Sequence, residues 1–95
     1  MSDHGRVILS RMVEMIDRYE DDHRNLRGLV DDLSCLYQSL EPAEQPPERP
    51  WLDALLPLER LLGDRQGVDA RRMRAHIDRH VSVLRELLVE CQRAG

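Results

Sequence analysis

The stretch LRGLVDDLSCLYQSL, residues 26–40, decides the fold of this chain. Its apolar side chains recur every three or four residues through four turns, a spacing that places them on one face only in an α-helix. A helix of this kind is stable only when other apolar faces cover it. The apolar positions are Leu26, Leu29, Val30, Leu33, Leu36, Tyr37 and Leu40.

The rest of the chain repeats this pattern. The sequence predicts helices over about 5–20, 23–40, 50–62 and 69–92. Ninety-five residues, of which 34% are charged, suit one domain whose helices each turn one face to water. The expected fold class is therefore all-α, as a compact bundle of four helices in a single domain, residues 1–95.

Asp21 or Asp22 is a good N-cap for the second helix, so a break is expected there. A single long helix over 6–40 is the alternative, because neither Pro nor Gly interrupts residues 20–25. Gly28 costs a helix about 1 kcal/mol against Ala, and we expect it to mark a close approach of another helix. Asp69 is the expected cap of the last helix.

Residues 41–50, EPAEQPPERP, contain four prolines and predict a stiff, extended connector. Pro50 fits the first position of the third helix. Pro57 falls in the middle of that short helix, which should kink there or restart as two pieces. Gly63 should end it.

The net charge of −4 is unevenly divided. Residues 1–48 carry eleven acidic residues and five arginines, whereas residues 49–95 carry seven acidic residues and nine arginines. An acidic chain is poorly suited to binding nucleic acid. Its charge instead favours a basic protein as partner. The alternative is that the two halves complement each other within the bundle.

The chain shows no nucleophile motif, glycine-rich phosphate loop or long apolar run. Cys35 and Cys91 are too few and too far apart to form a metal or disulfide signature. The opening residues do not resemble a signal peptide. We therefore expect a cytoplasmic, non-enzymatic protein with no cofactor, no membrane segment and reduced thiols.

His76 and His80, one helical turn apart, are a weak candidate for a metal site. Carboxylates from Glu14, Asp17 and Asp21 would have to complete the ligand shell. The repeated Glu-x-x-His ligands of di-metal bundles are absent, which favours two histidines at the edge of the bundle.

Four arginines on the last predicted helix form a basic face. No helix-turn-helix pattern or interleaved aromatic residue accompanies it, so nucleic-acid binding is a weak interpretation. Pairing with the acidic first half explains it more simply. These residues are Arg71, Arg72, Arg74 and Arg79.

Trp51 opens the third predicted helix. Tryptophan is enriched at binding hot spots, but a single one at a helix start is more often part of the core.

Residues 16–41, IDRYEDDHRNLRGLVDDLSCLYQSLE, are followed by Trp51 and by LPLERLL at 56–62. This order resembles small uncharacterised helical proteins of GC-rich bacteria, some of which are similar to immunity partners of secreted or contact-delivered toxins. The resemblance covers about two-thirds of the chain. It implies a protein partner and assigns no functional residue.

Together these features predict a non-enzymatic protein-binding module, most plausibly an immunity protein that neutralises a bacterial toxin. One alternative is a regulatory or scaffold bundle that self-associates as a homodimer through the Trp51 helix, and another is a metal-binding bundle. The expected partner-binding residues are Glu20, Asp21, Asp22, Asp31, Asp32, Glu41, Glu44 and Trp51.

Overall fold

Four α-helices make up the fold. A computed structural model describes residues 3–22, 25–63 and 73–94. The helices are α1 (Asp3–Asp22), α2 (Leu26–Ser39), α3 (Glu48–Gly63) and α4 (Arg74–Ala94), and the described residues contain no strand. The predicted all-α bundle is therefore confirmed.

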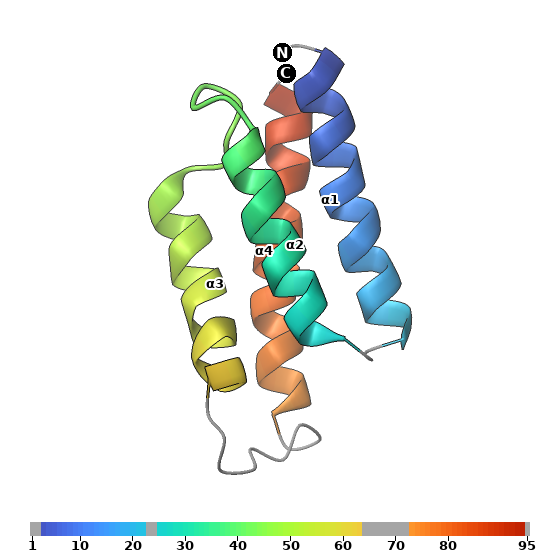
Figure 1. The fold of residues 1–95 in the computed structure, drawn as a ribbon, viewed down its shortest axis with the longest axis vertical. Coiled ribbons are helices and arrows are strands. Elements are labelled where there is room, and N and C mark those ends of the chain that lie inside the picture. The colour runs from blue at the N-terminus through green and yellow to red at the C-terminus, as the bar shows by residue number, and fades with distance from the viewer. Residues whose placement is uncertain (1–2, 23–24, 64–72, 95) are drawn as a thin grey trace.

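Each helix runs antiparallel to the next, so the start of α1 and the end of α4 lie at the same end of the bundle (Figure 1). Helices α1 and α3 occupy opposite corners, and each packs against both α2 and α4. Helix α2, which contains most of the sequence quoted above, thus has one seam with α1 and another with α3.

The four helices contribute almost equally to one apolar core. The described residues include no buried polar or charged residue. Met12, Leu33, Leu58 and Leu84, one from each helix, are 0% exposed. The other buried core residues are Ile8, Leu9, Ile16, Leu29, Val30, Leu40, Trp51, Ala54, Leu55, Ile77, Val81 and Leu88.

The predicted break between the first two helices is confirmed, but its position is wrong. Helix α1 continues to Asp22, and α2 is capped by Asn25, whose Oδ1 accepts a 2.9 Å hydrogen bond from the Gly28 amide. The cap therefore lies three or four residues after the predicted aspartates, and neither of them caps α2. A single helix over 6–40 is excluded.

We expected Gly28 to mark a close approach of another helix, but the side chain that lies closest to it is that of Asn25. A Cβ built at this position would lie 2.4 Å from Nδ2 and 2.8 Å from Cγ of Asn25. Glycine is suited to this position because the capping side chain folds back over it. The prediction was wrong because the neighbour is local and polar.

The proline-rich connector is folded rather than extended. The Glu44 and Gln45 amides both donate to the Glu41 carbonyl, at 2.8 and 3.2 Å, which closes a turn. The Gln45 side chain donates to the carbonyls of Tyr37 and Leu40, at 2.9 and 3.2 Å. The Tyr37 carbonyl also accepts from the Leu40 amide at 3.2 Å, so Gln45 adds a second donor there and supplies one to the Leu40 carbonyl just beyond α2.

Helix α3 starts at Glu48, two residues before the predicted position, and the Trp51 amide donates to the Pro47 carbonyl at 3.1 Å. The helix continues through Pro57 to Gly63, so two separate short helices are excluded and the predicted end is confirmed. Helix α4 starts at Arg74, later than the predicted 69. Asp69 lies outside the described residues.

Candidate functional site

The acidic residues proposed as a binding surface do not form one patch. They are spread from the end of α1, along α2, to the connector beyond it. The fourteen residues of α2 separate the two outer groups by about 20 Å, at 1.5 Å per residue. At the end of α1 lie Glu20, Asp21 and Asp22; within α2 lie Asp31 and Asp32; in the connector lie Glu41 and Glu44.

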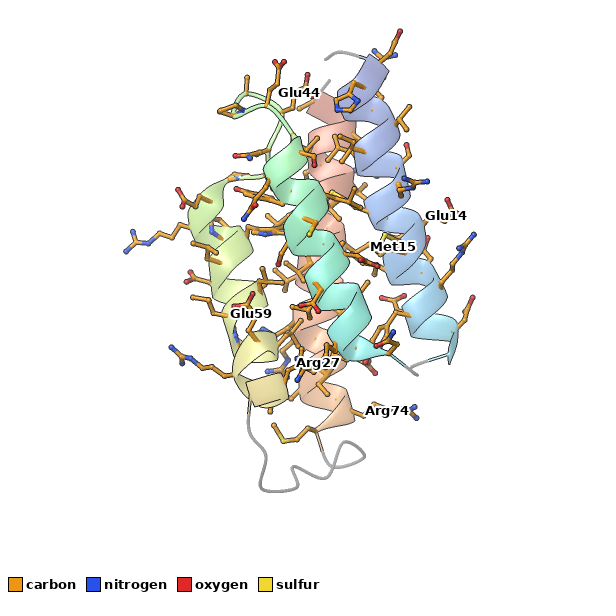
Figure 2. All side chains as sticks on the ribbon, in the orientation of Figure 1. Glu14, Met15, Arg27, Glu44, Glu59 and Arg74 are labelled. Atoms are coloured by element: carbon orange, nitrogen blue, oxygen red, sulfur yellow. The ribbon has the colours of Figure 1, made fainter. Side chains whose placement is uncertain are left out.

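Glu44 has a role inside the fold. Figure 2 shows it at the end of the bundle where α1 begins, and a Cβ at Gly5 would overlap its carboxylate. Gly5 lies in the first turn of α1, where the helix dipole stabilises a negative charge. Glu44 therefore fastens the connector to α1, and it is only partly exposed.

Glu20 is exposed on α1, three residues after an ion pair between α1 and α4. Arg85 on α4 donates a 2.8 Å hydrogen bond to Asp17 on α1. This bond and the charge of Asp17 raise the pKa of Arg85, and the charge of Glu20 raises it further. Glu20 is exposed and only adds its charge to this contact between α1 and α4, in which Asp17 of the acidic first half pairs with Arg85 of the second.

Trp51 belongs to the core, and its predicted place in a partner-binding surface is wrong. It is 1% exposed, and its ring stacks on Tyr37 with centroids 4.9 Å apart. A dimer seam on this helix would have to use the outward face of α3, where Leu56 is the exposed large apolar residue. The other two such residues among those described, Val7 and Val83, lie on other helices.

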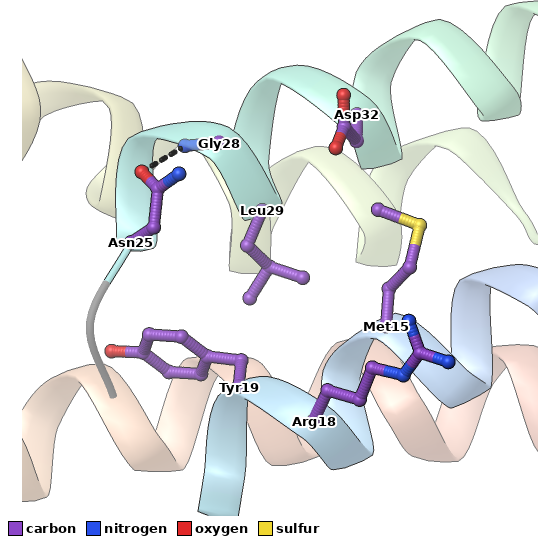
Figure 3. A pocket seen from close by; sticks show the side chains of 7 residues that line it. All are labelled: Met15, Arg18, Tyr19, Asn25, Gly28, Leu29 and Asp32. Carbon is purple, nitrogen blue, oxygen red and sulfur yellow. Dashed lines mark hydrogen bonds between the residues drawn. The ribbon is translucent and has the colours of Figure 1, made fainter. Parts of the chain in front are cut away.

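The remaining acidic residues differ in their surroundings. Asp21, Asp31 and Glu41 are exposed, and the side chain of Asp22 lies outside the description. Asp32 is also exposed, but it lines a pocket of about 230 Å³ between α1 and α2 (Figure 3). The other lining residues are Met15, Arg18, Tyr19, Asn25, Gly28 and Leu29.

The floor of this α1–α2 pocket is apolar. Met15 reaches from α1 towards Asp32 on α2, and Leu29 and Tyr19 line the pocket towards Asn25 (Figure 3). Met15 and Tyr19 are only partly buried, although they belong to the apolar face of α1. Burial raises the pKa of Tyr19, the charge of Asp78 raises it further and Arg74 opposes both, so the phenol is protonated at neutral pH.

Asn25 and Gly28 form one end of the pocket. The cap holds the first turn of α2 in place, and the absence of a side chain at Gly28 lets Asn25 fold back over it. Sequence reasoning missed this pair, since it assigned neither the cap nor the reason for the glycine. The spacing of Asn25 and Gly28, which fits a cap and its third helical residue, was the available signal.

The two charged groups at the pocket differ in their pairing. Arg18 donates to Glu14 at 2.8 Å, an exposed pair one turn apart on α1. Among the described residues, Asp32 has neither an ion pair nor a side-chain hydrogen bond. The uncompensated charge at the pocket is therefore negative.

The structure brings His76 and His80 together, with ring centroids 4.5 Å apart and planes at 80°. Burial lowers the pKa of His80, and the charges of His76 and Arg79 lower it further. The described residues contain no group of three or more side chains placed to hold a metal ion. Of the expected carboxylates, Asp17 is bonded to Arg85 and Glu14 to Arg18.

Arg74 and Arg79 are exposed on α4, and the other two arginines of the predicted basic face lie outside the described residues. The cross-half ion pair is made by Arg85, which was not in that set. Cys35 and Cys91 are both free thiols. None of the described helices is long and apolar enough to cross a membrane.

Comparison with protein-family models, with curated proteins and with solved structures found no match for this chain.

Proposed function

We propose that this chain is a non-enzymatic binding module that recognises a basic protein through the α1–α2 face. The observation that carries the proposal is Asp32, an exposed carboxylate without an ion pair among the described residues, beside a pocket with an apolar floor. Interfaces commonly combine a buried apolar centre with a polar rim. Asp21, also exposed, adds negative charge at the end of α1, whereas the charge of Glu14 is offset by Arg18.

The acidic balance of the first half supports the same partner chemistry. Negative charge on one partner and positive charge on the other accelerate association and select against acidic partners. The resemblance to small bacterial helical proteins suggests the class of partner, namely a toxin domain that this chain would neutralise. In that role the bundle needs no catalytic group, because occupying the partner's surface is sufficient.

The test is a comparison of two charge-reversed chains as baits in lysate of the source strain. The first carries Asp21→Lys, Asp31→Lys, Asp32→Lys and Glu41→Lys. The matched control carries Asp53→Lys, Glu59→Lys, Glu86→Lys and Glu90→Lys on α3 and α4. Each chain carries four charge reversals, so the two have the same net charge. All eight positions are exposed, so both chains should keep the core.

We expect the wild-type chain and the control to retain one stoichiometric basic partner, identified by intact mass, and the first variant to lose it. Circular dichroism confirms that all three chains are folded. Retention of the partner by the first variant, or equal loss in both variants, would contradict the proposed face. Recovery of the bait alone would contradict a protein partner.

A further inference from the structure

We infer that the α1–α2 pocket binds a single arginine side chain of the partner. The guanidinium pairs with Asp32, and the aliphatic stem packs against Met15 and Leu29. This inference rests on the proposed function and makes it more specific. It assigns the partner a chemical feature that the acidic surface alone does not define.

The size of the pocket indicates one side chain. A volume of about 230 Å³ lies below the roughly 300–1,000 Å³ typical of pockets for whole small molecules. The pocket is open to solvent along the groove, so a side chain projecting from another protein can enter without any movement of α1 or α2.

The charges favour a cation. Asp32 is the charged group at the pocket that has no ion pair among the described residues, whereas the charge of Arg18 is offset by Glu14 at 2.8 Å. An incoming anion would have to compete with Glu14 for Arg18. An incoming cation finds a carboxylate that is already free.

The floor favours arginine over lysine. A guanidinium is planar and more weakly hydrated than an ammonium group, and it forms forked hydrogen bonds with a carboxylate. It also stacks on aromatic rings and rests on apolar surface. Met15 provides such a surface next to Asp32, and Leu29 and Tyr19 continue it towards the Asn25 end of the pocket (Figure 3). An ammonium group is more strongly hydrated and would have to lose much of its hydration shell at these apolar surfaces.

Asp31 provides a matched control within the same helix. It is exposed and adjacent to Asp32 in sequence, but it does not line the pocket. Successive helical residues point about 100° apart, so the two carboxylates face different directions. Asp31→Asn and Asp32→Asn change the net charge equally, and any difference between them reports position rather than charge.

The experiment is a methyl NMR titration of the intact chain with N-acetyl-arginine amide as probe. The neutral citrulline analogue and N-acetyl-aspartate amide serve as comparisons. We expect saturable shifts at the methyl groups of Met15 and Leu29, with a dissociation constant in the roughly millimolar range that a single side chain supports. Asp32→Asn should weaken binding about tenfold and Asp31→Asn less than about twofold.

Arg18→Gln should strengthen binding of the arginine probe, because it removes the competing cation and frees Glu14. Three results would overturn the inference: no saturable shift at Met15 and Leu29, equal effects of the two asparagine variants, or stronger binding of the citrulline or aspartate probe. Each leaves the proposed function standing if the charge-reversal experiment succeeds. If charge reversal on the α1–α2 face leaves capture of the partner unchanged while arginine binding is intact, the proposed function is contradicted instead.

Discussion

The two seams of α2 have similar side chains, but the connector covers the seam with α3, whereas the seam with α1 contains an open pocket. On the α3 side, Tyr37 stacks on Trp51, and its hydroxyl donates to the carbonyl of the buried Pro46 at 3.0 Å. The connector folds over this seam. On the α1 side, Tyr19 and Leu29 line a pocket that stays open, with Asp32 at its rim.

The closed α3 seam contributes residues that stabilise the fold, whereas the open α1 seam contains the residues proposed to bind a partner. Each seam contains a tyrosine: Tyr37 of α2 stacks on Trp51 of α3, and Tyr19 of α1 lines the pocket with Leu29 of α2. The α3 seam is closed by the chain itself and tied at its other end by Arg27, which donates to the Leu62 carbonyl at 3.2 Å. The α1 seam leaves apolar surface next to an unpaired carboxylate, which is the combination expected of a recognition surface.

The largest expected effect contrasts the two seams directly. Trp51→Ala should lower the free energy of unfolding by about 3–5 kcal/mol, because it removes a fully buried ring and leaves a cavity. Met15→Ala, at the partly buried wall of the pocket, should cost about 1 kcal/mol. Urea unfolding followed by circular dichroism measures both. Similar costs would show that the α1 seam is as tightly packed as the α3 seam.

The next effect concerns the cap at the end of α2. Gln45→Ala should lower the free energy of unfolding by about 1 kcal/mol, because it removes two hydrogen bonds to the carbonyls of Tyr37 and Leu40. Gln38→Ala, an exposed change on α2 itself, should stay within about 0.5 kcal/mol. If Gln45→Ala is as mild as the control, the connector does not close the α3 seam.

The cap at the pocket should show strong coupling in a double-mutant cycle. Asn25→Ala should cost about 1 kcal/mol in the free energy of unfolding. Gly28→Ala should be nearly neutral alone, because the gain in helix propensity is offset by displacement of Asn25. In the Asn25→Ala background the same change should stabilise by up to about 1 kcal/mol. Additive effects in the cycle would contradict the packing of Asn25 over Gly28.

The smallest effect is a pH dependence at His80, on α4. Its pKa in the folded state is lowered below the ordinary 6.5, so the unfolded chain binds more protons as pH falls through that range. The free energy of unfolding should therefore decrease from about pH 7 downwards and level off below the folded pKa. His80→Gln should flatten this part of the profile. A profile unchanged by the substitution would assign the dependence to other groups.

The helices and most of the core could be predicted from periodicity, because the 3.6-residue repeat alone fixes which positions share a face. Leu33 and Leu58 follow from it. Two residues that the same repeat places on an apolar face are nonetheless exposed: Val7 at 65% and Leu56 at 40%. Each lies at the edge of its apolar stripe, and only the placement of the neighbouring helices decides whether an edge is covered.

The connector and the candidate site were less predictable for a related reason. The prolines of residues 41–50 limit backbone angles, but the turn depends on Gln45 meeting carbonyls of α2. Asp32 was named among the acidic candidates, but nothing in its local sequence distinguishes it from Asp31. The distinction comes from α1, whose Met15 lines the pocket together with Asp32 and not with Asp31.

The most direct test of the central claim, that the open α1–α2 groove is the binding surface, is the affinity of the captured partner for the two asparagine variants. Asp32→Asn should weaken binding about tenfold or more, chiefly through faster dissociation, and Asp31→Asn less than about threefold. Equal affinities for the two variants, or a larger loss with Asp31→Asn, would contradict the claim.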